Sequence, residues 1–433
     1  MKRSIIFFLF SVLMLSACKK EDDTLFEQSP DNRLNEALNT YQSALVNSPA
    51  GWKATLRLSR GDLYNFHFRF DNSNRVFMFA DINSETATTE RESSYRLKAL
   101  QTPSLLFDTY SYLHILADPD GSVNGGTDGQ GLSSDFEFSL DSLVADTIYL
   151  TGRKYGTKLV LQKATQQDLD AWRNGGWAQV LSLENINKIQ QYFKRILIGG
   201  REYEVRVDVT SRTINFIWID GSGSPQQFST TFVYSGGGIV LNTPFDTGNE
   251  VVSQIQINSW DGTNSVLNVT VNGTPTKIAG AARPLVVDAS APRRWWEQAA
   301  AEDAYWYSVD GFHVNGVDDA FGIKTLDKYF YFIYWPSYAP GSNDLFAPVY
   351  IDDAGTGLEL KYGAAPGVPQ FTSDGRAIFT LLGHYGTYPT TGPAALTKDQ
   401  LFTAQGYYFV QTGADSYDMV SASDAKVWVS WVR

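Results

Sequence analysis

The chain of 433 residues is acidic and rich in aromatic residues, with a formal net charge of −12 and a single cysteine. The negative charge argues against nucleic acid and anionic lipid headgroups as partners, because both would on average be repelled. One cysteine allows neither a disulfide within the chain nor a metal site built from several thiolates. The many aromatic residues, together with 36 glycines and 16 prolines, are typical of short strands joined by tight turns.

Residues 1–17 have the pattern of a secretory signal peptide. Lys2 and Arg3 are the basic start, residues 5–15 are apolar, and Ser16 and Ala17 are the small residues before a cleavage site. The apolar stretch is too short to span a bilayer. Removal of this segment would take the net charge from −12 to −14, because two basic residues would be lost.

Residues 15–18 (Leu-Ser-Ala-Cys) have the form of a bacterial lipobox, in which the cysteine is acylated and becomes the mature N-terminus. We therefore expect Cys18 to anchor the protein in outer-membrane lipid, since several acyl chains hold a protein far more firmly than one. An ordinary secretory peptide with a coincidental cysteine is the alternative. Residues 20–23 (Lys-Glu-Asp-Asp) resemble the lysine-plus-acidic signal that sends Bacteroidetes lipoproteins to the cell surface. A merely polar tether over 18–30 is the alternative there.

A helix followed by a β-meander is predicted for residues 31–164. Apolar residues from Leu34 to Leu45 recur at helical spacing. The period then changes to two, and in Leu63–Phe70 aromatic residues alternate with others, which predicts one face in a core. Eight such segments in sequence predict an antiparallel meander, closed as a barrel or folded as a sandwich. The expected strands are 52–58, 63–70, 75–81, 94–100, 104–107, 135–140, 147–150 and 158–162.

The pattern of helix and strands restarts twice. Thr165–Asp168 has capping-box form at the start of a second domain, residues 165–286, and the apolar residues of 186–196 predict another helix there. A third domain, residues 287–433, opens with a helix and continues into strands rich in tyrosine and tryptophan. The sequence therefore predicts a mainly β protein built from antiparallel β-meander domains (barrel or sandwich), each preceded by a short helix.

Two stretches of sequence, Leu25 to Leu56 and Glu92 to Gly126, resemble a Bacteroidetes family of lipoproteins that carries a domain-of-unknown-function label. The resemblance is specific through Cys18 and the first two predicted domains, and thin beyond them. It implies a setting beside starch-utilisation-type uptake systems, in which a TonB-dependent outer-membrane transporter works with a substrate-capturing lipoprotein. It implies no catalytic or binding residue.

Common catalytic motifs are missing from the sequence. The four histidines are far apart and form no His-Glu-x-x-His motif. Residues 221–225 lack the last glycine of a Gly-x-Ser-x-Gly elbow and fit a hairpin loop better. A pair of carboxylates for glycoside hydrolysis is defined by its separation in space, so the 47 acidic residues leave that class open.

A glycine-rich loop concentrates oxygen donors at Asp118, Asp120, Asn124 and Asp128. Such donors suit Ca²⁺, although the loop has neither the residue order of an EF-hand nor its terminal glutamate. A plain turn or a ligand-contacting loop is the alternative. The unusual length of this connection, residues 117–134, favours function or mobility.

Aromatic residues of the third domain are candidate ligand contacts, because flat rings with polar edges can stack on sugars or on peptide side chains. Most of these rings are expected in the core, since the alternation in this part is that of a buried strand. Prolines flank Trp335 and Tyr338, so these two are expected to be exposed in a loop. The candidate ligand-binding residues are Trp295, Trp296, Trp335 and Tyr338.

The sequence favours a surface-anchored, non-catalytic binding or accessory subunit of an outer-membrane nutrient uptake system, with a glycan or peptide ligand. A surface hydrolase of glycan or peptide, and a structural brace for the transporter complex, are the alternatives. An exposed aromatic groove would favour binding, and a pocket with two suitably spaced carboxylates would favour hydrolysis. A featureless surface with one large apolar patch would favour the brace.

Overall fold

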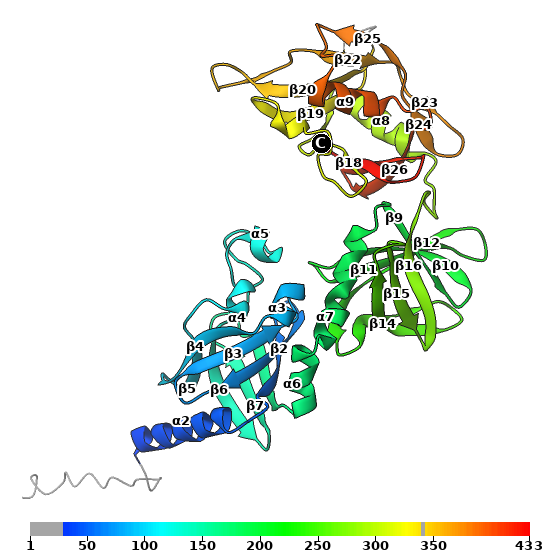
Figure 1. Cartoon of the computed structure of the whole chain (residues 1–433). Coiled ribbons are helices and arrows are strands. Elements are labelled where there is room, and N and C mark those ends of the chain that lie inside the picture. The colour runs from blue at the N-terminus through cyan, green and yellow to red at the C-terminus, as the bar shows by residue number, and fades with distance from the viewer. Residues whose placement is uncertain (1–28, 339–342) are drawn as a thin grey trace, which may run out of the picture.

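Three β units follow one another along the chain in the computed structural model, which describes residues 29–338 and 343–433 (Figure 1). The first two units are closed barrels of eight antiparallel strands, and the third is an open 12-stranded antiparallel sheet. The predicted fold class is confirmed: the protein is mainly β with antiparallel sheets, and a short helix precedes each of the three units. Among the described residues, no helix has the length and apolar content needed to cross a membrane.

The first unit begins with helix α2 (Pro30–Val46), where the side chain of Ser29 accepts a hydrogen bond from the backbone N–H of Asn32 at 3.3 Å. Each strand pairs with the next, and β1 pairs with β8 to close the barrel. The strands are β1 (Trp52–Arg57), β2 (Leu63–Phe70), β3 (Arg75–Ala80), β4 (Arg91–Ala99), β5 (Pro103–Phe107), β6 (Glu137–Val144), β7 (Thr147–Gly152) and β8 (Lys158–Lys163). Short helices α3 (Ser84–Thr88), α4 (Tyr112–Ile115) and α5 (Gly121–Asn124) lie in the connections.

Strand β2 shows why this segment folds as it does. Its aromatic residues at every second position, Tyr64, Phe66, Phe68 and Phe70, are all buried in the barrel core, as the alternation predicts. The Phe68 ring lies 5.5 Å, centroid to centroid, from the Phe107 ring of β5. The barrel is therefore filled by large rings from facing strands.

The second unit is a barrel in which β9 pairs with both β10 and β16. Its helices are α6 (Gln166–Arg173), α7 (Gly176–Leu181) and the 3₁₀ helix η1 (Ser182–Lys188). Its strands are β9 (Phe193–Ile198), β10 (Arg201–Asp208), β11 (Thr213–Ile219), β12 (Pro225–Ser235), β13 (Gly238–Asp246), β14 (Val251–Asp261), β15 (Val266–Val271) and β16 (Thr274–Ala281).

The helix predicted over 186–196 is wrong. Residues up to Lys188 form the 3₁₀ helix η1, and Phe193–Ile198 forms the strand that closes the second barrel. Backbone pairing with two neighbouring strands decides the conformation here, because tertiary context overrides a short local pattern. Phe193 and Ile196 are buried in the strand, and apolar residues three positions apart also fit one face of a helix, so their spacing could not separate the two conformations.

In the third unit the strand order departs from the chain order, since β17 pairs with β28 at the C-terminal end of the chain. Its helical segments are α8 (Ala291–Ala301), η2 (Ile323–Thr325) and α9 (Gly392–Leu401). Its strands are β17 (Trp306–Ser308), β18 (His313–Val314), β19 (Tyr329–Trp335), β20 (Leu345–Ile351), β21 (Leu358–Glu359), β22 (Gly363–Pro366), β23 (Gln370–Phe371), β24 (Arg376–Ile378), β25 (Leu381–Tyr385), β26 (Tyr407–Gly413), β27 (Ser416–Ser421) and β28 (Val427–Val432).

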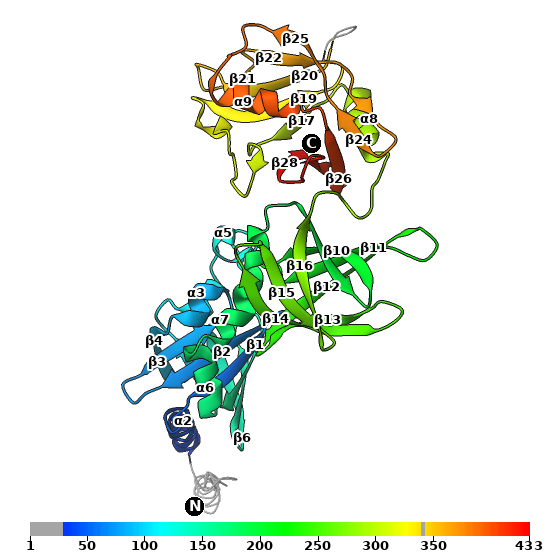
Figure 2. The same cartoon turned by 45° about the vertical axis from the view of Figure 1, so that its right-hand side comes forward.

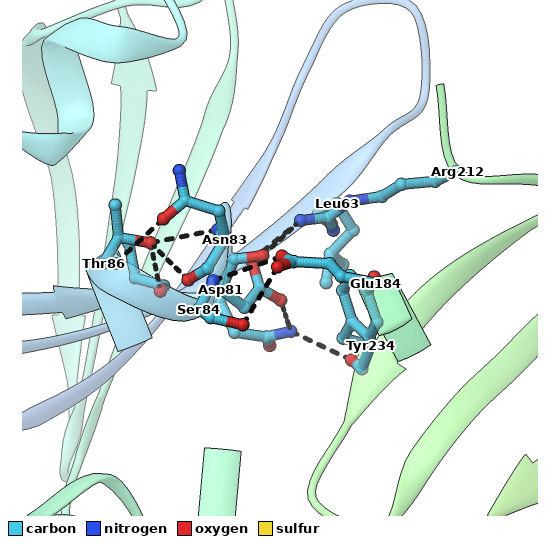
Figure 3. Close-up of polar contacts among 10 residues, drawn as sticks. Leu63, Asp81, Asn83, Ser84, Thr86, Glu184, Arg212 and Tyr234 are labelled. Carbon is cyan, nitrogen blue, oxygen red and sulfur yellow. Dashed lines mark hydrogen bonds and ion pairs between the residues drawn. The ribbon is translucent and has the colours of Figure 1, made fainter. Parts of the chain in front are cut away.

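Polar contacts join the first barrel to the second (Figure 3). Arg212, from the turn after β10, donates hydrogen bonds to the carbonyl oxygens of Leu63 and Asp81 and forms an ion pair with the Asp81 carboxylate. Nearby, the backbone N–H and the hydroxyl of Ser84 both donate to the Glu184 carboxylate, at 3.1 and 2.9 Å. At this junction between the first and second barrels, the charged side chains therefore have hydrogen-bond or ion-pair partners.

The second barrel contacts the third unit through Tyr192. Its hydroxyl donates to Asp418 at 2.6 Å, its backbone N–H donates to the carbonyl oxygen of Ala425 at 2.8 Å, and its ring packs edge-on against Trp428. Both views show helix α2 at one end of the molecule and the third unit at the other (Figures 1 and 2). The two junctions thus hold the three units in an extended arrangement.

Candidate binding surface

Strand β19 separates two sets of side chains in the third unit. Phe332 and Tyr334 face the core around Trp295, whereas Tyr331, Ile333 and Trp335 belong to a smaller cluster, because side chains alternate across a strand. Half-buried rings from three strands (β17, β19 and β25) and from the segments that precede β17 and follow β19 surround the small cluster. We call these rings the aromatic patch: Tyr305, Tyr307, Tyr331, Trp335, Tyr338 and Tyr385.

Neighbouring rings of the aromatic patch are in contact. The Trp335 ring lies 5.2 Å from the rings of both Tyr305 and Tyr338, and Tyr338 lies 5.3 Å from Tyr385, centroid to centroid. Aromatic pairs at such separations favour tilted or edge-on packing, which fixes each ring. The patch is therefore a surface whose rings are already ordered by their neighbours.

Polar edges accompany the rings of the aromatic patch. The hydroxyls of Tyr305 and Tyr331 lie 3.0 Å apart, and the Tyr385 hydroxyl donates to the carbonyl oxygen of Asn343 at 3.0 Å. The indole N–H of Trp335 is buried and has no hydrogen-bond partner among the described residues. Burial raises the pKa of the Tyr331 hydroxyl far above its usual value.

Trp335 and Tyr338, two of the predicted ligand contacts, lie together in the aromatic patch. Trp335 is the last residue of β19 rather than part of a loop, and both rings are half-buried rather than fully exposed. Their partner Tyr305, just before β17, belongs to the aromatic set that the sequence assigns mostly to the core, and Tyr385 was not identified from the sequence, because β17 and β25 reach this site only through long-range strand pairing. No local spacing marks them.

The prediction for Trp295 is corrected by its burial. Its side chain is 0% exposed and packs among rings that include Trp306 and Tyr334, so it has no face on which a ligand could stack. Helix α8 presents this residue to the core of the third unit. An aromatic residue on an amphipathic helix is most often a core residue, and Trp295 is one.

Trp296 is connected to the aromatic patch through Asp344, which also bonds to the turn that follows β19. Its indole N–H donates to the Asp344 carboxylate at 2.7 Å, and the same carboxylate accepts hydrogen bonds from the Tyr334 hydroxyl and the Ser337 backbone N–H. Asp344 is buried, so these three donors are what satisfies its charge. The turn between Trp335 and Tyr338 is thereby fixed. Its only sequence signal is one acidic residue before an apolar strand.

In the loop predicted as a calcium site, the side-chain oxygens accept hydrogen bonds from nearby residues of the same unit. Asp118 accepts hydrogen bonds from the Tyr110 hydroxyl and from the Asp120 backbone N–H, and Asp120 accepts them from Ser122. Asp128 accepts from the Gly121 backbone, and Asn124 accepts from Gly126.

This bonding pattern gives the calcium expectation no support, and the calcium site stays a prediction. The side-chain oxygens accept hydrogen bonds that close the loop. The described residues contain no group of three acidic, histidine or cysteine side chains suited to a metal ion. Cys18 and the charged tether after it lie outside the described residues.

Comparisons with known proteins give one clear match. Residues 22–259 match the model of a family described as a domain of unknown function, DUF4302. No curated protein matches the chain. A Helicobacter pylori beta clamp bound to a DNA ligase peptide aligns over 93% of this chain and 97% of its own, with 7% identity and a TM-score of 0.16. A DNA polymerase sliding clamp from Pseudomonas aeruginosa aligns over the same shares with 7% identity and a TM-score of 0.13. Scores this low carry no argument about fold or function.

Proposed function

We propose a function from the premise that this chain belongs to the DUF4302 family. It is a cell-surface lipoprotein that binds a glycan or peptide without turning it over, as a binding or accessory subunit of an outer-membrane nutrient uptake system. The observation that supports this proposal most is the aromatic patch, which gathers six half-buried rings on one sheet face. Ordered tyrosine and tryptophan rings give contact area at little cost in conformational entropy.

The character of the aromatic patch favours a ligand over a purely structural surface. Its rings are only partly buried, and the indole N–H of Trp335, which has no hydrogen-bond partner in the part of the chain that the structure describes, lies among them. A buried donor without a partner is costly, and a ligand oxygen would satisfy it. Sugar hydroxyls and peptide carbonyls both supply such oxygens.

The extended arrangement of the units fits an anchor at the N-terminus. Helix α2 starts shortly after Cys18 in the sequence, and the third unit lies at the opposite end of the molecule (Figure 2). Acyl chains on Cys18 would therefore hold the first barrel near the outer membrane and leave the aromatic patch at the outer end. A TonB-dependent transporter and its substrate-capturing lipoprotein are the expected partners.

A structural brace for the transporter is the second candidate, favoured by the contacts at both junctions. Arg212 with Asp81, and Tyr192 with Asp418, hold the units in fixed relation, as a spacer would require. A brace needs no ligand, so the two functions differ in what the aromatic patch does.

The function is tested on intact cells that display the wild type or Trp335→Ala/Tyr338→Ala. Fluorescent oligosaccharides and peptides are added, bound label is measured, and added protease reports the amount of protein at the surface. We expect the wild type to retain one class of label and the double variant to lose it at equal surface amount. Equal retention by both would contradict the binding function, and co-purification with the transporter without any retention would favour the brace.

A further inference from the structure

The aromatic patch lies in a part of the third unit that carries no lysine or arginine. The segments that hold or underlie the patch are 304–309, 329–338, 343–351, 363–366 and 381–387. Their charged or basic side chains are one carboxylate, Asp344, and one histidine, His384. The lysines next to β19 and β22, Lys328 and Lys361, form ion pairs with acidic neighbours. With histidine neutral, the excess charge around the patch is therefore negative.

Asp344 brings this negative charge next to the rings. Its carboxylate accepts a hydrogen bond at 2.8 Å from the backbone N–H of Ser337, which lies between Trp335 and Tyr338 in the chain. Asp344 is 1% exposed and its three donors are neutral groups, so its charge is not cancelled and is poorly screened by water. Burial raises the pKa of the Tyr385 hydroxyl, and Tyr338 and Asp344 add to the rise. The buried charge therefore acts on rings of the patch.

The ring faces of the patch favour a cation as well. An aromatic ring is negative on its faces and positive at its edge, so a cation is attracted to the face. The Trp335 ring stands at 70° to the Tyr338 ring, and the Tyr338 ring stands at 71° to the Tyr385 ring. Faces turned by such angles border one group from more than one side. Among the described residues, no lysine or arginine lies over a ring of the patch.

The junction of the two barrels holds a guanidinium in a similar setting. The guanidinium carbon of Arg212 lies 3.9 Å from the centroid of the Tyr64 ring and 4.9 Å from that of Tyr234. Behind it lies the buried carboxylate of Asp81, at 3.1 Å. The aromatic patch has the corresponding rings and a buried carboxylate, and the cation is the part that the described chain does not supply there.

We infer that the aromatic patch binds a peptide through an arginine side chain, with the guanidinium against the ring faces of Trp335, Tyr338 and Tyr385. A guanidinium is planar and weakly hydrated, so it stacks on rings more readily than the ammonium of lysine or of an amino sugar. The peptide backbone also supplies carbonyl oxygens for the indole N–H of Trp335. A neutral glycan supplies oxygens but no cation. This assignment rests on the proposed function, because it names the ligand class of the same patch.

Calorimetric titration of the full-length protein, purified in non-ionic detergent, tests the arginine ligand. The probes are the end-blocked peptide Gly-Arg-Gly-Arg-Gly, the same peptide with lysine or with glutamine in place of arginine, and the neutral oligosaccharide maltohexaose. At physiological ionic strength we expect the arginine peptide to bind about fivefold or more tightly than the glutamine peptide, with the lysine peptide between them.

Trp335→Leu/Tyr338→Leu removes two ring faces but keeps apolar side chains. It should abolish the preference for arginine and change the affinity for the glutamine peptide less. Tyr149→Leu is the matched control, because Tyr149 is a 45% exposed ring on the first barrel. If the double variant melts at a lower temperature than the wild type, Tyr385→Leu decides, because β25 lies at the end of the strand order and has β22 as its one neighbour among the described strands.

The chain carries −12, so a basic peptide is attracted to other parts of its surface too. A preference for arginine that survives both the double variant and Tyr385→Leu would therefore overturn the assignment to the patch. Equal affinity for the glutamine peptide or for maltohexaose, lost in Trp335→Ala, would overturn the arginine ligand and leave the proposed function intact. Absence of binding by all the probes would also overturn the arginine ligand, whereas the proposed function is decided by label retention on intact cells.

Discussion

Arg212 of the second barrel and Asp81 of the first form an ion pair at 3.1 Å whose side chains are 4% and 0% exposed. The guanidinium carbon also lies 3.9 Å from the centroid of the Tyr64 ring and 4.9 Å from that of Tyr234. Burial raises the pKa of Asp81, and the adjacent Arg212 partly opposes that rise. The pair therefore ties two barrels together only as long as both charges are present.

Arg212→Met should lower the free energy of unfolding by about 3–5 kcal/mol, because it leaves the Asp81 carboxylate buried without its counter-charge. Urea denaturation followed by tryptophan fluorescence measures this. Arg75→Gln is the control, since Arg75 forms an ion pair with Glu92 in which both side chains are about half exposed, and it should cost less than about 1 kcal/mol. A loss below about 1 kcal/mol for Arg212→Met would show that the junction does not depend on the pair.

Asp288 is expected to make stability depend on acid pH. Hydrogen bonds from Arg294, followed by those from Ser290, lower its pKa to about 2. In the unfolded chain the pKa of an aspartate is about 3.9. The Asp288 carboxylate therefore stabilises the fold above that pH, and this stabilisation is lost as the pH falls toward 2.

Asp288→Asn tests this dependence. Because the Asp288 side chain is 49% exposed, solvent screening limits the expected loss at pH 7 to about 1 kcal/mol. The difference between variant and wild type should shrink between pH 4 and pH 2 in denaturation curves. A difference that stays constant with pH would contradict the charge argument and point to the shape of the side chain instead.

Chelation should leave the melting temperature unchanged. The oxygens of Asp118, Asp120 and Asp128 accept hydrogen bonds from the loop that carries them, so a Ca²⁺ ion would have to displace those donors. Differential scanning calorimetry with EDTA, and then with excess Ca²⁺, measures the effect. A melting temperature that falls with EDTA and recovers with Ca²⁺ would contradict this, because a ligand bound to the native state alone stabilises it.

Cys18→Ala should release the protein from the outer membrane. The lipobox prediction makes this thiol the only attachment point, and loss of the acyl chains removes the apolar area that holds the protein in lipid. Immunoblots of membrane and soluble fractions measure the shift, with Ser16→Thr as a variant that keeps the cysteine. Unchanged membrane association of Cys18→Ala would overturn lipidation as the anchor.

The sequence predicts a strand correctly where apolar residues occupy every second position over many residues. Leu63–Phe70 alternates through its whole length, and β2 has those same bounds. Phe193–Ile198 was misread, because apolar residues at threefold spacing fit both a helix and a strand with two paired edges. The pairing of β17 with β28 could not be predicted, since nothing local specifies a partner more than a hundred residues away.

The candidate site was predictable only in part for the same reason. Trp335 and Tyr338 are neighbours in sequence, so their grouping was visible, whereas Tyr305 and Tyr385 join them through the fold. Composition alone could not tell the buried Trp295 from a surface ring. The internal hydrogen bonds of the loop at Asp118 depend on its three-dimensional closure, which residue types do not reveal.

The most direct test of the account is a binding titration of Trp335→Ala against a panel of neutral oligosaccharides and peptides. Tyr149→Ala is the matched control, because Tyr149 is a 45% exposed ring on the first barrel, away from the aromatic patch. We predict that the wild type and the control bind one ligand class equally, and that Trp335→Ala loses about 1 kcal/mol or more, a factor of about five. Equal affinity of all three proteins, or hydrolysis of the ligand by the wild type, would contradict binding at the aromatic patch without turnover.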